Sequence, residues 1–228
     1  MQHRYNPFMQ IHKGLKAMLY HTAMSIQHND FSDELATGHV IDQVQKVLWL
    51  FDGHAHTEDS MVFPLIQNFA PHIVKDFEAQ HVTDHELAEE VERCLDKMLE
   101  VKSRNDQYET GMELKHAFER FLAFNLEHMI KEETQVAPAI WANYSDEDLH
   151  QLTARIVQSI PQDKNELYTD WMLIGNSNKE VIEWLDNVKA TAPSFVFEGL
   201  CNRAQQLLPI SRWQIIEAAM YENMAALN

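Results

Sequence analysis

Apolar residues recur at steps of three and four along almost the whole chain, and this helical period constrains the fold more than any other feature. Sustained apolar–polar alternation is missing, and no Asn-Gly or Asp-Gly pair joins two alternating segments. The sequence therefore predicts an all-α protein. The clearest stripe places eight side chains on one helix face: Val40, Val44, Val47, Phe51, His54, Glu58, Met61 and Leu65.

Four such stripes occupy the first part of the chain, and turn residues separate them near positions 31, 70 and 104. Helices of roughly 20 to 35 residues joined by short connections are expected to run up-down-up-down. We therefore predict a four-helix bundle over residues 1–144.

The texture changes in residues 145–228, where shorter segments are expected. Prolines break this region at three places: Pro161, Pro193 and Pro209. Capping boxes, which begin helices, are expected at three serines: Ser145, Ser177 and Ser211. We predict a C-terminal appendage of four or five short helices.

Charge and composition narrow the classes of partner. The formal charge of -17 would repel phosphate backbones and anionic lipids, so neither nucleic acid nor a membrane is expected as a partner. The chain shows no secretory leader and lacks the ~18 consecutive apolar residues of a membrane span, which favours a cytoplasmic protein. Cys94 and Cys201 form no CxxC pair, so we expect buried free thiols.

Ionisable groups interrupt the apolar stripes. The spacing His-x3-Glu-x5-Pro occurs twice, at His54, Glu58 and Pro64 and again at His128, Glu132 and Pro138. The seven groups on the stripes are His12, His54, Glu58, His81, His85, His128 and Glu132. Two buried carboxylates without a counter-charge would each cost on the order of several kcal/mol, and the stripes hold no Lys or Arg in register. A bound cation is the simplest resolution.

Position along the bundle brings the seven groups to one level, because antiparallel helices align residues whose sequence midpoint falls at the connecting turn. The midpoint between His12 and His54 is residue 33. Those of the next two pairs, from His54 to His85 and from His85 to His128, fall near residues 70 and 106. On each of the last three helices the paired groups are four residues apart and share a face.

Seven His and carboxylate ligands exceed what one ion takes and fit two. Imidazole with carboxylate suits iron, manganese or zinc, and we favour iron. A ferritin-like dinuclear site is the rival, because such sites use Glu-x-x-His pairs and the chain contains Glu78 with His81 and Glu113 with His116. That site is disfavoured because residues 1–29 contain no acid and Glu113 lies far from the layer.

The combined pattern resembles the hemerythrin family, specifically the hemerythrin-type cation-binding domains of bacteria. The resemblance covers residues 5–144 and rests on one His in the first helix, H-x-x-x-E before Val-Phe-Pro in the second, H-x-x-x-H in the third and H-x-x-x-E in the fourth. It implies one iron held by His81, His85 and His128, another held by His12 and His54, and bridges from Glu58, Glu132 and an oxo or hydroxo group. One coordination position would stay open for dioxygen, nitric oxide or peroxide.

Oxygen-carrying hemerythrins place an Asp further beyond the last His, so the four-residue step from His128 to Glu132 disfavours reversible oxygen carriage. Glu133 is the alternative ligand there. Residues 145–228 resemble the extension that follows such domains in some bacterial proteins and in iron-responsive plant ubiquitin ligases. A protein partner or a second copy could bind through this extension.

These observations favour a non-haem di-iron protein that binds or senses dioxygen or a related small molecule, or that handles iron. The alternative is a di-iron enzyme: an oxidase, a peroxidase or a nitric-oxide-consuming protein. A metal-free helical interaction module is a third reading, and it leaves the layer of seven groups unexplained.

Overall fold

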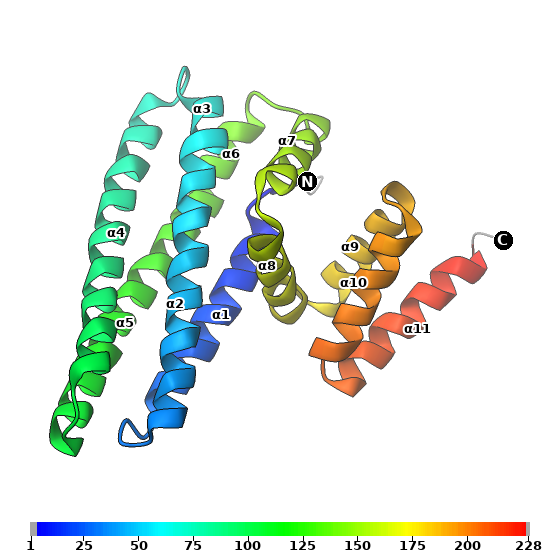
Figure 1. Cartoon of the computed structure of the whole chain (residues 1–228). Coiled ribbons are helices and arrows are strands. Elements are labelled where there is room, and N and C mark those ends of the chain that lie inside the picture. Colours follow the sequence, from blue (N-terminus) through cyan, green and yellow to red (C-terminus); the bar gives the residue numbers. More distant parts are fainter. Residues whose placement is uncertain (1–3, 227–228) are drawn as a thin grey trace. The chain divides into compact units, whose positions relative to one another are not determined.

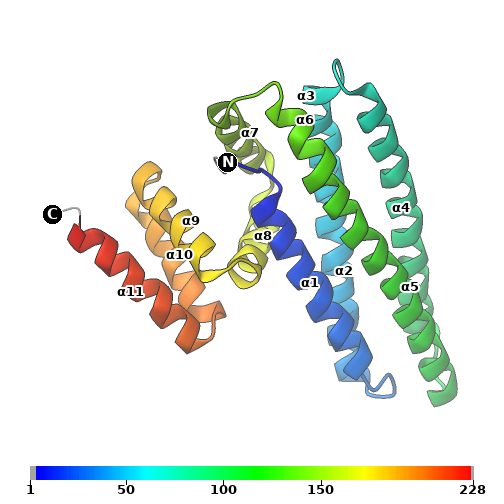
Figure 2. The ribbon, with the colours of Figure 1, turned by 180° about the vertical axis from the view of Figure 1, so that it is seen from behind.

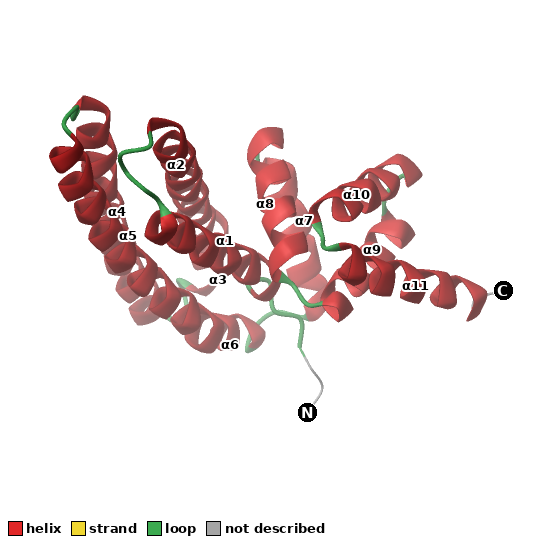
Figure 3. Ribbon diagram, turned by 90° about the horizontal axis from the view of Figure 1, so that it is seen from below, coloured by secondary structure: helices red, strands yellow, loops and turns green. Residues whose placement is uncertain are grey.

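The computed structural model describes residues 4–226, with side chains described for residues 4–220. Every regular element in this range is a helix, and Figure 3 accordingly shows red helices and green loops but no yellow strand. The all-α prediction is confirmed. None of the described helices combines the length and the apolarity that a membrane crossing requires.

The described chain divides into two compact units. The first contains residues 4–9 and 18–160, and the second contains residues 10–17 and 161–226. Helix α1 (Met9–His28) is one continuous helix whose residues belong to both units. Residues 10–17 belong to the second unit, and the rest of the helix belongs to the first. The domain boundary expected after residue 144 stays a prediction.

Besides its share of α1, the first unit consists of helices and two short π-helical segments. In chain order these are α2 (Glu34–Thr57), η1 (Glu58–Val62), α3 (Phe63–Ile66), α4 (Pro71–Glu100), α5 (Arg104–Lys131), η2 (Glu132–Val136), α6 (Ala137–Trp141) and α7 (Asp146–Ser159). Four helical rods lie side by side and run up-down-up-down (Figures 1 and 2): α1, then α2 through α3, then α4, then α5 through α6. The connections at residues 29–33, 67–70 and 101–103 fall where turns were expected.

An apolar cluster closes the end of the bundle at which η1 and η2 lie. Its fully buried members include Phe63, Ile66, Phe77, Val136, Ala137, Ile140 and Leu149. Because burial of apolar surface is the main favourable term in folding, this cluster anchors both π-helical segments. The residues that begin η1 and η2 are thereby held against a dry part of the core.

Side-chain caps fix several helix starts. Asp33 accepts a hydrogen bond from the Ala36 amide at the start of α2, and Ser145 and Ser177 form the expected capping boxes. The capping box expected at Ser211 is wrong, because α11 (Ile210–Ala226) already begins at Ile210. Pro209 precedes that first residue, and a proline suits the entry to a helix because it needs no amide partner there.

The second unit contains α8 (Gln162–Gly175), α9 (Asn178–Thr191), α10 (Ser194–Leu207) and α11. These helices share a core that includes Leu173, Val181, Leu185, Ala204 and Ile216. Residues 10–17 of α1, which belong to this unit, pack closely on the end of α8. The approach is so close that a Cβ added at Gly175 would lie 2.3 Å from the Lys13 carbonyl oxygen. A salt bridge of 2.5 Å between Lys13 Nζ and Glu180 Oε1 joins the same segment to α9. Cys94 and Cys201 are free thiols, half-buried rather than buried.

Candidate metal centre

Two carboxylates begin the two π-helical segments. Glu58 is the first residue of η1 and Glu132 is the first of η2, and in each segment a backbone amide five residues on donates to the carbonyl of that glutamate. A proline follows one residue later, at Pro64 and Pro138, and neither can donate the hydrogen bond that a regular α-helix requires. π-Helical turns are rare and occur frequently at functional sites. The repeated spacing in the sequence thus produces the same local backbone twice.

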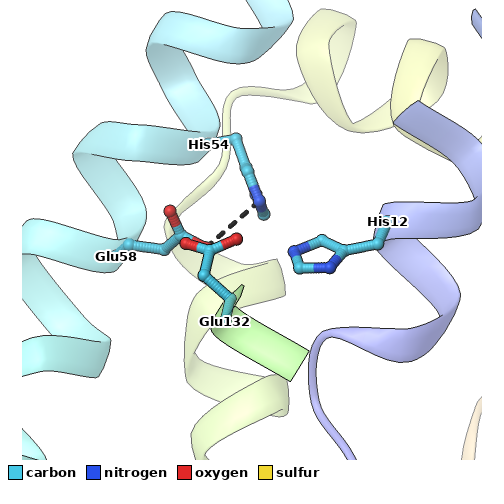
Figure 4. Close-up of side chains that lie close together, drawn as sticks. All are labelled: His12, His54, Glu58 and Glu132. Atoms are coloured by element: carbon cyan, nitrogen blue, oxygen red, sulfur yellow. Dashed lines mark ion pairs between the residues drawn. The ribbon is translucent and has the colours of Figure 1, made fainter. Parts of the chain in front are cut away.

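Six of the seven expected side chains come together. One group contains His12, His54, Glu58 and Glu132, and a second contains Glu58, His81, His128 and Glu132. Within each group, one potential ligand atom per residue lies within 4.8 Å of all the others. Figure 4 shows the first group converging from α1, α2, η1 and η2. The two groups are adjacent because they share both carboxylates.

The shared carboxylates are deeply buried and closely approached by imidazoles. Glu58 is 2% exposed and Glu132 is 0% exposed. The nearest imidazole atoms are His54 Nε2 at 3.1 Å from Glu58 Oε1, His81 Nε2 at 3.4 Å from Glu58 Oε2, and His128 Nε2 at 3.1 Å from Glu132 Oε1. Within the described residues, neither oxygen of Glu58 is satisfied by a hydrogen bond, nor is Nε2 of His81. Buried polar atoms in this state are what a metal ion would satisfy.

Electrostatics support the same reading. Burial raises the pKa of Glu58 well above its usual 4.5, and the neighbouring Glu132 carboxylate raises it further. In the metal-free protein Glu58 therefore keeps its proton to a higher pH than an ordinary carboxyl group does. A cation between the carboxylates would displace that proton, so metal binding and proton release are coupled. The residues present fit a cation site.

Hydrogen-bonding groups behind two of the imidazoles orient them. Asp59 Oδ1 lies 2.9 Å from His81 Nδ1, and Gln80 Oε1 lies 3.3 Å from His128 Nδ1. An acceptor at Nδ1 favours the tautomer in which Nε2, the nitrogen directed at the carboxylates, is free to bind a metal ion. Both rings also pack against phenylalanines, with centroids 5.4 Å apart for Phe63 and His81 and 5.3 Å apart for Phe77 and His128.

The structure does not bring His85 into either group. Its side chain is 74% exposed, and its Nε2 lies 3.4 Å from Glu89 Oε1 on the outside of α4. The buried stripe of α4 alternates strictly by three and four: Val74, Phe77, His81, Asp84, Ala88, Val91, Leu95 and Met98. This alternation turns position 84 inward and position 85 outward. The alternative ligand Glu133 is also in neither group.

Asp84 is a residue near the site that the sequence reading missed. Its side chain is buried, and Asn125 Nδ2 donates to its Oδ1 at 2.6 Å. Burial raises the pKa of Asp84, although the Asn125 hydrogen bond and the charges of His128 and His81 act in the opposite direction. The three-four alternation on α4 is the signal that could have found it.

The ferritin-like alternative receives no support from the geometry. Glu78 is exposed on α4, and Glu113 Oε2 lies 2.6 Å from Lys97 Nζ in a solvent-exposed pair. Neither belongs to the two groups that could hold an ion in the described part of the chain. The second carboxylate of the site comes instead from η2, as the repeated motif indicated.

Comparisons with known proteins give a consistent picture. The sequence profile of the hemerythrin HHE cation-binding domain matches residues 3–140. A BRUTUS-like zinc finger protein of Arabidopsis thaliana is 23% identical over 192 residues, which cover 82% of this chain and 15% of that protein. The chain thus spans a small part of the length of this curated relative. No solved structure matches the chain.

Proposed function

Because the chain belongs to the hemerythrin HHE cation-binding family, we propose that its buried cluster binds two iron ions and thereby binds or senses dioxygen or a related small molecule, or handles iron. One observation carries the proposal: two adjacent groups share Glu58 and Glu132, and each is completed by two histidines. His12 and His54 would complete one site, and His81 and His128 the other.

The donor set supports iron. Four imidazoles, which are ligands of intermediate hardness, combined with two hard carboxylates suit iron, manganese and zinc and disfavour calcium or magnesium. Each ion would have four protein donors, which leaves room for ligands from outside the protein. Bound iron would supply electron transfer and the binding of a small molecule at such a position.

The surrounding residues have separate tasks in this proposal. Glu58 and Glu132 would hold the two ions together and balance part of their charge. Asp59 and Gln80 would keep the Nε2 atoms of their histidines free to bind. The apolar cluster around Phe63 would exclude water from the carboxylates, which strengthens every electrostatic interaction within the site.

The test is anaerobic reconstitution with ferrous iron, followed by metal analysis of the desalted protein. The wild type should retain about two irons per chain, because both buried carboxylates need charge compensation. Glu58→Gln preserves the side-chain size but removes a shared charge, so it should lose iron from both sites. Glu133→Gln is the matched control, since Glu133 directly follows Glu132 and belongs to neither group.

Two results would reject the proposal. One is a folded wild-type protein that retains no iron after reconstitution. The other is a Glu58→Gln variant that retains as much iron as the wild type. If only Glu133→Gln lost iron, Glu133 rather than its neighbour Glu132 would be the ligand.

A further inference from the structure

A surface groove of about 800 Å³ runs between η1 with α3 on one side and the first half of α4 on the other. All of these elements belong to the first unit, and α3 and α4 are labelled in Figure 1. Three ionisable side chains line it besides His81: Asp59, Glu78 and His85. Of the six clustered residues, His81 is the one that also lines this groove in the described part of the chain.

His81 therefore has one side on the groove and the other on the buried cluster. Its Nδ1 lies 2.9 Å from Asp59 Oδ1, which belongs to the groove lining. Its Nε2 lies 3.4 Å from Glu58 Oε2 inside the site and has no hydrogen-bond partner among the described residues. The His81 ring thus borders both the groove and the shared carboxylate of Glu58.

The groove carries the same kinds of ligand as the buried site, but in water. His85 follows His81 by four residues on α4, so the two Cα atoms are about 6 Å apart along the helix axis and both side chains border the groove. Asp59 and Glu78 add carboxylates from either side of the groove. A metal ion held by exposed side chains of this kind exchanges its ligands readily, because water can replace each side chain.

We propose that this groove is the route by which a hydrated divalent metal cation enters the buried site. Exposed Glu78 and His85 hold the cation transiently, and the cation then passes beside His81 to reach Glu58. The inference rests on the proposed function, since it presumes that the cluster binds metal. It gives His85 a role in the rate of metal loading rather than in the final complex.

The rate of iron uptake tests the route. Anaerobic protein is mixed with Fe²⁺, and a chromophoric ferrous chelator captures the free ion at successive times. Val82→Trp adds bulk to an exposed side chain of the groove that belongs to neither ligand group, whereas the double variant Glu78→Gln/His85→Gln removes the transient ligands. Both variants should take up iron at least about tenfold more slowly than the wild type, with an unchanged final iron content.

Matched controls lie on the same helix outside the groove. Leu99→Trp places the same bulk at another exposed position of α4, and Glu86→Gln removes the same charge. Both controls should load at the wild-type rate. Wild-type rates in the groove variants would overturn the route, and a reduced final iron content in the double variant would overturn the transient role. A wild type that binds no iron would reject the proposed function itself.

Discussion

Glu58 and Glu132 occupy equivalent positions in two helical rods. Each is the first residue of a π-helical segment, four residues after a histidine and six before a proline, and each belongs to both groups that could hold an ion. In the proposed di-iron centre the two carboxylates would therefore serve both ions. A change at either one is expected to affect the whole centre.

The first prediction concerns the pH dependence of the metal-free protein. The pKa of Glu58 is raised in the folded state by burial and by Glu132. The contribution of Glu58 to stability is therefore present below pH 4.5 and is lost as the pH rises toward the folded-state pKa. Metal-free protein should therefore become less stable above about pH 4.5. Glu58→Gln should flatten this slope, measured by urea unfolding with chelator present. Asp84 keeps part of the slope, because burial raises its pKa as well. An unchanged slope would contradict the assignment.

The second prediction concerns Asp59, which holds the Nδ1 proton of His81. Asp59→Asn should weaken metal binding about 10- to 100-fold, because the ring loses the carboxylate that orients it. Competition with a chelator of known affinity measures the change. Asp52→Asn, at an exposed acid on α2, is the control, and Asp59→Glu should restore part of the affinity. Equal affinities in Asp59→Asn and Asp52→Asn would show that the contact has no such role.

The third prediction separates two histidines of α4. At equilibrium His85→Ala should retain about two irons per chain, because the side chain is exposed and lies outside both groups, whereas His81→Ala should lose iron. Metal analysis after prolonged reconstitution measures both variants. A loss of one iron in His85→Ala would restore the ligand set that the sequence implied.

The contrast between His85 and Asp84 shows where the sequence was sufficient and where it was not. Side chains four residues apart on a helix are separated by about 40°, and those three apart by about 60°, so both positions could face the core beside His81. The sequence motif favoured His85. The surrounding apolar residues of α4 decide the matter, because Phe77 and Val91 fit an alternation that buries Asp84.

Other parts of the fold followed directly from local pattern. The stripes around His54 and His128 predicted which faces are buried, and the turns between rods fell at the expected positions. The π-helical segments were not predicted, since they arise from prolines acting within otherwise regular helices. The close approach of α8 to α1 at Gly175 was missed for a different reason, because a contact between distant segments leaves no periodic signal.

The fourth prediction uses Glu180. Its partial burial favours a raised pKa, but hydrogen bonds from Lys13 and Ser177 outweigh that effect and bring the pKa to about 2. The stability that Glu180 contributes is present above pH 4.5 and is lost as the pH falls toward about 2. Glu180→Gln retains a capping-box residue but loses the ion pair, so it should reduce the loss of stability between these pH values. Acid titrations of both proteins, followed by circular dichroism, measure the difference, and identical acid limbs would contradict it.

The fifth prediction compares two glycines of the second unit. Gly175→Ala should destabilise the protein by about 1–3 kcal/mol, because the added Cβ meets the Lys13 carbonyl. Gly199→Ala should instead stabilise it by about 0.5–1 kcal/mol, since this position lies inside α10 with open space around it. Urea unfolding of the full chain gives both values. Equal effects of the two substitutions would contradict the packing described here.

The most direct test of the central claim is the magnetic state of the oxidised, iron-reconstituted protein. Two ferric ions that share Glu58 and Glu132 are expected to couple antiferromagnetically. At about two irons per chain, Mössbauer spectra should therefore show a diamagnetic ground state, and electron paramagnetic resonance should show no signal from isolated ferric ions. A single iron per chain, or a full complement of uncoupled high-spin ferric ions, would contradict a shared centre.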